Sequence, residues 1–271
     1  MLKVLSIGNS FSDDAQAWAH EVFASAGEEA LFGNLYIGGC SLERHLHNAQ
    51  THEAAYSYRR NMVTMGDEGT ATLDTGLLDE DWDYVTFQQA SHFSGQWPTY
   101  EPYLRPLADY VRRRCPNAKF AVHQTWAYEQ DSTHPGFAHY ENSQARMYVA
   151  LHECYDRAAK LLDAPVIPCG DAVQIARALP PFDYAHGGKS LNRDGFHLSL
   201  VGGRYLAALV WFGFFTGRSP EEVAFVPERK TWQYAGMKDE KPQLRLFSRE
   251  ALTAEEVAAL RQAAARVTAH T

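Results

Sequence analysis

The chain has 271 residues, of which 45% are hydrophobic and 21% charged, and its formal net charge is -8 at pH 7. These proportions are typical of a soluble globular protein with a sizeable core. The negative charge argues against a nucleic-acid backbone or an anionic membrane as the main partner, because either would favour a clustered basic face.

The first predicted element is a short buried strand near residues 2–7, and the stretch IGNSFSDD begins at its last residue. A helix is predicted over residues 13–26, because apolar side chains recur there at helical spacing. Ser10 therefore lies in a strand-to-helix turn at the carboxyl edge of a sheet, where ligands bind in open α/β folds. Alternatively, Ser10 and Ser12 serve only to cap the helix.

Short apolar runs alternate with longer amphipathic runs along the chain, which is the pattern of a parallel sheet wrapped by helices. Residues 62–82 and 216–250 interrupt this pattern, and we expect them to be excursions from a single domain over residues 1–271. The basic runs Tyr58–Arg60 and Arg112–Arg114 are predicted to lie on solvated helix faces. Strands are expected near residues 2–7, 31–37, 83–88, 119–124 and 165–168, and helices near 13–26, 41–61, 101–115, 138–162, 171–179, 199–215 and 253–269.

Nothing in the sequence indicates a metal, a cofactor or a targeting segment. The four cysteines form no CxxC pair or other zinc-type spacing, so buried thiols are expected. His134 and His139, with Asp131, match no common metal site, and we expect lid or surface roles for them. No signal segment precedes the first strand, and the longest apolar run is far shorter than the ~20 residues of a membrane span. We therefore expect a cytoplasmic protein.

Near the end of the chain, residues 186–199 read HGGKSLNRDGFHLS and place Asp194 and His197 three residues apart in a loop. An aspartate that accepts a hydrogen bond from one ring nitrogen leaves the other nitrogen free to take a proton from a hydroxyl. Ser10 could supply that hydroxyl, which predicts a catalytic triad of Ser10, His197 and Asp194. Taken alone, an Asp-x-x-His pair before a helix serves more often as a cap.

The chain resembles the SGNH, or GDSL-like, hydrolases over residues 1–215. GNSFS is similar to their nucleophile block, with Ser10 as the nucleophile, and RDGFH is similar to their last block. Together with IGGCSLERH, FQQASHFSG and HQTWAY, these stretches resemble a bacterial branch whose activity is poorly defined. The resemblance implies a three-layer α/β/α sandwich around a mostly parallel, five-stranded sheet in the flavodoxin-like order.

The resemblance also implies an oxyanion hole built from the N–H of Ser10, the N–H of a glycine after the second strand, and an asparagine side chain after the third. Gly39 fits the glycine, whose backbone must approach the substrate closely. No asparagine stands in the third place. We favour Gln89 there, with Gln88 and His92 as alternatives, although both glutamines could instead bond loop backbone.

The expected activity is ester hydrolysis through an acyl-enzyme, and short acyl groups of the acetyl type on a carbohydrate are the expected substrates. Aromatic and hydrogen-bonding side chains after the fourth strand suit the apolar faces and polar rims of sugars, although Trp126 and Tyr128 could equally belong to the core. The alternatives are a non-catalytic carbohydrate-binding protein of the same fold and an O-acyltransferase with the same triad. The expected substrate contacts are Asn9, His92, Gln124, Trp126 and Tyr128.

Overall fold

The computed structural model of the chain describes residues 1–238 and 241–269. Its main sheet has the strand order β4-β3-β2-β1-β5-β6-β7. Five of these strands, in the order β2-β1-β5-β6-β7, run parallel to one another, which is the flavodoxin-like order when they are counted along the chain. The strands are β1 (Leu2–Gly8), β2 (Ala30–Tyr36), β3 (Ser57–Arg60), β4 (Val63–Thr64), β5 (Tyr84–Phe87), β6 (Lys119–His123) and β7 (Val166–Ile167).

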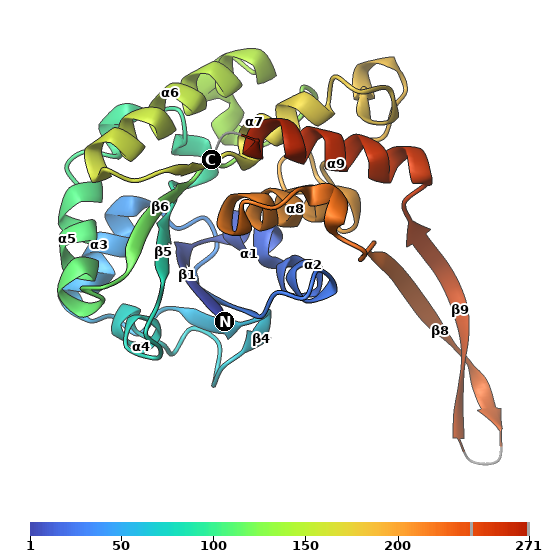
Figure 1. Ribbon diagram of the computed structural model, residues 1–271, viewed down its shortest axis with the longest axis horizontal. Coiled ribbons are helices and arrows are strands. Elements are labelled where there is room, and N and C mark those ends of the chain that lie inside the picture. Colours follow the sequence, from blue (N-terminus) through green and yellow to red (C-terminus); the bar gives the residue numbers. More distant parts are fainter. Residues whose placement is uncertain (239–240, 270–271) are drawn as a thin grey trace.

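Helices cover both faces of this sheet, so the predicted three-layer α/β/α sandwich is confirmed (Figure 1). One layer contains α1 (Ser10–Gln16), α2 (Ala19–Ser25), α7 (Cys169–Ala176), α8 (Gly202–Thr216) and α9 (Ala254–Thr268). The other contains α3 (Leu42–Thr51), α4 (Leu73–Leu77), α5 (Leu104–Arg114) and α6 (Gln144–Leu162). No helix of the described residues is long and apolar enough to cross a bilayer.

The sheet has seven strands where five were predicted, because β3 and β4 add an antiparallel edge to β2. The helix predicted over residues 41–61 is wrong in its second half. It ends at Thr51, and His52 adopts the left-handed conformation that closes many helices. The predicted helical run at Tyr58 is therefore strand β3, in which Tyr58 is buried and Arg59 lies over the ring of Tyr36.

Residues 216–250, which we expected to be an excursion, contain two strands that were not predicted. Strands β8 (Glu228–Lys238) and β9 (Lys241–Ala251) form a separate two-stranded antiparallel sheet. We call this hairpin the β8–β9 arm. It projects away from the sandwich between helices α8 and α9 (Figure 1).

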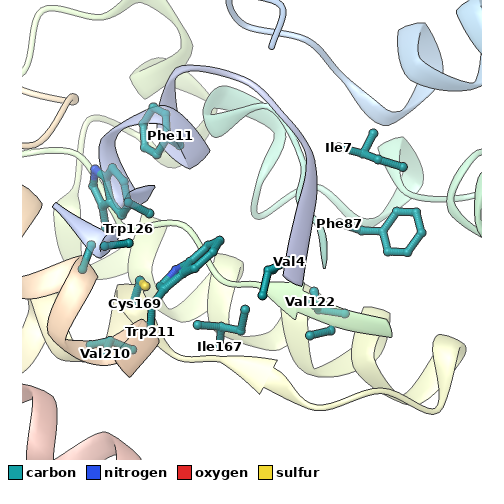
Figure 2. Close-up of a cluster of buried hydrophobic side chains, with 14 of the residues drawn as sticks. Val4, Ile7, Phe11, Phe87, Val122, Trp126, Ile167, Cys169, Val210 and Trp211 are labelled. Atoms are coloured by element: carbon teal, nitrogen blue, oxygen red, sulfur yellow. The ribbon is translucent and has the colours of Figure 1, made fainter. Parts of the chain in front are cut away.

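The core fills both faces of the sheet, and α8 is its most completely buried helix. Residues Tyr205 to Gly213 of this helix are all buried, which agrees with its almost continuous apolar sequence. Trp211 of α8 lies close to Cys169 and Ile167 in the cluster shown in Figure 2. All four cysteines are buried free thiols, and burial raises the pKa of Cys115 and Cys154 to about 11.

Candidate active site

The turn between β1 and α1 gives its two serines different positions. Asn9 caps α1 by accepting a hydrogen bond from the N–H of Phe11, so Ser10 is the first helical residue and is partly exposed. Ser12 is fully buried, and its Oγ lies 2.9 Å from Asn34 Oδ1. A Cβ at Gly8 would lie 1.9 Å from that Oγ, so only glycine fits beneath the turn. Ser12 therefore supports the turn, whereas Ser10 faces outward from it.

Ser10, His197 and Asp194 form one continuous hydrogen-bonded chain. The Oγ of Ser10 lies 2.8 Å from Nε2 of His197, although 187 residues separate them. Nδ1 of His197 lies 2.7 Å from Oδ2 of Asp194. The other carboxylate oxygen accepts hydrogen bonds from the N–H groups of Phe196 and His197. Burial alone would raise the pKa of Asp194, but the hydrogen bonds from His197 and the backbone outweigh it and lower that pKa.

Asp183 and His186 form a second hydrogen-bonded Asp-x-x-His pair shortly before Asp194 in the chain, but no serine in the described part of the chain bonds to it. His186 Nδ1 lies 2.8 Å from Asp183 Oδ2, almost the same geometry as in the first pair. Its imidazole is largely exposed, and no hydroxyl of the described residues bonds to its other nitrogen. An Asp-x-x-His motif with a direct hydrogen bond between its two side chains therefore occurs twice among the described residues, and only one copy meets a serine.

Asp14, which the sequence analysis did not single out, joins the loop of Asp194 and His197 to helix α1. It lies one helical turn after Ser10 and is fully buried. Its carboxylate accepts hydrogen bonds from the backbone N–H of Leu198 at 2.8 Å and from the guanidinium groups of Arg193 and Arg204. The only hint in the sequence was an acidic residue on the apolar face of a predicted helix.

We expect Asp14→Ala to lower the free energy of unfolding by about 3–5 kcal/mol, because two guanidinium groups would lose their buried partner. Urea unfolding measures this loss. Activity of the folded variant should also fall, since the loop that carries His197 is no longer held. Asp13→Ala is the matched control, because Asp13 pairs with Arg59 and makes no contact with the loop. Equal activities of the two variants would contradict this role for Asp14.

The hydrogen-bonded chain opens into a cavity of about 580 Å³ at the carboxyl edge of the sheet. Gly39 lines it with φ of +62°, a conformation that favours glycine. Neither the N–H of Ser10 nor that of Gly39 donates a hydrogen bond within the described part of the chain. Asn9 holds the two segments together, since its Nδ2 donates to the carbonyl of Cys40 at 3.1 Å. The two residues that carry these free N–H groups both line the cavity.

The chain is similar to known proteins in family and in fold. The family described as Domain of unknown function (DUF4886) matches residues 3–240. The chain belongs to the DUF4886 family. A crystal structure of a DUF4886 protein from Bacteroides uniformis is 34% identical and covers 99% of this chain and 95% of its own, with a TM-score of 0.85. No curated protein sequence matches the chain.

More distant solved structures show which fold the DUF4886 chain has. A protein described as a GDSL-like lipase from Parabacteroides merdae is 14% identical, with a TM-score of 0.51 over 78% of this chain and 94% of its own. TesA is 13% identical, with a TM-score of 0.50 over 79% of this chain and 98% of its own. The fold is that of the SGNH, or GDSL-like, hydrolases, as the resemblance implied.

The prediction that Gln89 supplies the third oxyanion donor is wrong. Its side chain is fully buried, and its Nε2 donates to the carbonyl and hydroxyl oxygens of Thr99. Gln88 is also buried, and its Nε2 donates to Oδ1 of Asn9 at 2.7 Å. Both amides are thus committed to loop structure. Of the three residues considered, only His92 lines the cavity, and neither of its ring nitrogens bonds to a described residue.

We expect Gln89→Ala to lower the free energy of unfolding by about 1–3 kcal/mol, because the N–H groups of Leu42 and Ala90 lose their shared acceptor. Its kcat on an activated ester should stay within a few-fold of the wild-type value. His92→Ala, the comparison variant, should lower kcat more and stability less. The opposite order of effects on kcat would restore Gln89 as the donor.

Four of the five predicted substrate contacts are also wrong, because their side chains are buried away from the cavity. Asn9 caps α1, and Gln124 donates to Asp171 at 3.0 Å. Trp126 stacks on Phe11 with ring centroids 4.5 Å apart (Figure 2), and its Nε1 donates to a backbone carbonyl. The hydroxyl of Tyr128 bonds to Ser91. These residues support the cavity wall, and His92 alone among the five faces the cavity.

The remaining lining includes residues that the sequence analysis missed or placed elsewhere. Aromatic rings come from four segments, which are α1, the end of β2, the turn after β5 and the loop of His197. His134 and His139 line the cavity where lid or surface roles were expected. For most of these residues the detectable signal was their position at the carboxyl ends of parallel strands. Tyr36 ends β2, Phe93 follows β5, and His134 and His139 follow β6. Among the described residues, no three His, Cys, Asp or Glu side chains gather closely enough to hold a metal ion. Beyond Ser10, Gly39, His92 and His197, the lining residues are Phe11, Tyr36, Gly38, Ser91, Phe93, His134, Pro135, Gly136, His139 and Phe196.

Proposed function

We propose that the chain is a serine esterase that removes short acyl groups from a carbohydrate through an acyl-enzyme. The observation that carries this proposal is the unbroken chain from Ser10 through His197 to Asp194, ending in a cavity beside two free N–H groups. A nucleophile within hydrogen-bond reach of a base, itself oriented by a carboxylate, is the arrangement that acyl transfer requires.

In this mechanism, Nε2 of His197 takes the proton of Ser10 as the hydroxyl oxygen attacks the ester carbonyl. The N–H groups of Ser10 and Gly39 stabilise the developing oxyanion. Asp194 keeps the proton of the neutral imidazole on Nδ1 and stabilises the imidazolium. His197 then protonates the departing alcohol, and a water molecule repeats the sequence to release the acid.

The composition of the cavity supports a small acyl group and a polar, uncharged alcohol. None of the described residues that line it is a lysine, an arginine or an acidic residue, so a charged substrate has no opposite charge to meet. Leucine, isoleucine, valine and methionine are equally missing from the described lining, which disfavours a long alkyl chain. Aromatic rings beside imidazole groups suit a sugar, whose apolar faces can stack while its hydroxyls form hydrogen bonds.

A fluorophosphonate probe tests the nucleophile, because it modifies a serine only when that serine is activated. We expect one probe molecule per chain, located on Ser10 by mass spectrometry of peptides, and parallel hydrolysis of 4-nitrophenyl acetate. Modification elsewhere, or hydrolysis without modification of Ser10, would overturn the proposal.

The same assays separate the two alternatives. A non-catalytic carbohydrate-binding protein would neither react with the probe nor release nitrophenol, and the intact hydrogen-bonded chain argues against it. An acyltransferase would react with the probe but would pass the acyl group to a sugar added as acceptor. Chromatography of the products with and without that sugar distinguishes transfer from hydrolysis.

A further inference from the structure

His134 lies at the end of the cavity opposite the free N–H of Gly39. Gly39 follows β2, whereas His134 lies in the segment that follows β6, and the strand order β2-β1-β5-β6 separates these strands by three spacings. At about 4.8 Å per spacing, β2 and β6 lie about 14 Å apart. The ring of His134 lies 4.8 Å from that of Phe196, the residue next to His197. His134 therefore belongs to the side of the cavity that holds the catalytic base.

The backbone fixes which nitrogen of His134 carries its proton. The N–H of Gly136 donates to Nδ1 of His134 at 3.0 Å, so Nδ1 must be unprotonated. A neutral ring then carries its proton on Nε2. Burial lowers the pKa of His134, and the neighbouring His197 lowers it further, so the neutral form prevails at neutral pH. Nε2 is thus a permanent donor, and it has no partner among the described residues.

Packing also fixes where this donor lies. Tyr128 and Phe196 contact the ring of His134 at centroid distances of 4.9 and 4.8 Å. A Cβ at Gly136 would lie 2.3 Å from Cβ of His92, so the segment lies tightly against the neighbouring loop. His92 stacks on His134 at 6.0 Å, but neither of its ring nitrogens forms a hydrogen bond with a described residue, so its own proton is not fixed. His134 is the histidine with a defined donor.

We propose that His134 recognises the alcohol part of the ester by donating its Nε2–H to a neighbouring hydroxyl or ring oxygen. This inference rests on the proposed esterase function. His197 must protonate the departing alcohol, so that alcohol lies on the His197 side while the carbonyl oxygen lies towards the N–H of Gly39. A donor there selects alcohols with an additional oxygen close to the ester, which are polyhydroxylated alcohols such as sugars.

The test is His134→Asn, assayed on two acetate esters. Asparagine is a preferred cap, so its side-chain oxygen keeps the bond from Gly136 N–H, while its shorter side chain withdraws the donor from the cavity. We expect kcat/KM for a mono-O-acetylated methyl glycoside to fall by about tenfold, as for one lost hydrogen bond. The value for 4-nitrophenyl acetate, whose alcohol has no such oxygen near the ester, should change less than threefold.

His139→Asn is the matched control, because His139 lines the same cavity but is exposed, and its ring nitrogens form no hydrogen bond with a described residue. It should leave the ratio of the two kcat/KM values unchanged. If His134→Asn lowers both substrates equally, or neither, the inference fails while the esterase function stands. It fails likewise if the wild type hydrolyses the aryl ester but not the glycoside. A wild type that hydrolyses neither ester would overturn both proposals.

Discussion

Ser10→Ala is expected to lower kcat for ester hydrolysis by about 10³ to 10⁶, because it removes the nucleophile and leaves only binding and the oxyanion hole. The variant should fold normally, since the Ser10 side chain is partly exposed and its loss opens no space in the core. Measurement of kcat on 4-nitrophenyl acetate, with thermal unfolding in parallel, separates the two effects. Retention of more than a few per cent of turnover would contradict the nucleophile assignment.

Ser12→Ala is the matched control two residues away. Its hydroxyl bonds to Asn34 and to the backbone N–H of Asn9 inside the turn. Its loss should cost about 1–3 kcal/mol of stability, since buried polar groups lose their partner. Turnover of the folded protein should largely remain. Ser10 would then serve catalysis, and Ser12 would serve the stability of the turn.

Asp194→Asn is expected to lower kcat by about 10⁴ with little loss of stability. Oδ1 of Asp194 accepts hydrogen bonds from the N–H groups of Phe196 and His197, so the oxygen of the new amide would take that place. Its NH₂ would then face Nδ1 of His197 and donate to it. The imidazole proton would move to Nε2, where it points at Ser10 and prevents proton removal from the hydroxyl.

The second Asp-x-x-His pair provides the control for this substitution. Asp183→Asn changes the same kind of contact, which Asp183 makes with Nδ1 of His186. No serine of the described residues bonds to the other nitrogen of that ring. Its kcat should equal that of the wild type, as measured on the same ester. If both variants lose activity equally, the effect arises from disturbance of the loop and not from the tautomer of His197.

The features that could be predicted from the sequence are those that short, local sequence patterns determine. The strand before GNSFS, the turn that follows it and the Asp-x-x-His loop are each encoded within about ten residues, and parallel strands bring their carboxyl ends to one edge. The relation of Ser10 to His197 therefore followed from two short motifs and the expected fold. Gly39 was implied by the family resemblance, and the structure places it in the cavity lining with a positive φ.

The errors came from choices that tertiary contacts decide. The amide of Gln89 suits an oxyanion and a loop backbone equally well, and the position of Thr99 settles the matter. Trp126 has the same apolar ring whether it meets a sugar or Phe11. Arg59 and Arg60 favour helices intrinsically, but the free edge of β2 recruits them into a strand. The deciding partner lies ten residues away for Gln89 and much farther along the chain for Trp126 and the two arginines.

The β8–β9 arm has a consequence for how proteins of this family can diverge. Glu228 and Ala251 pair at its base, so the chain leaves and rejoins the sandwich at one point. Insertion of one residue in each strand would lengthen the arm by about 3.3 Å and preserve its pairing. Helices α8 and α9 would not have to move, and neither would the carboxyl edge of the main sheet, where the cavity lies. Evolution can therefore alter the reach of the arm independently of the chemistry.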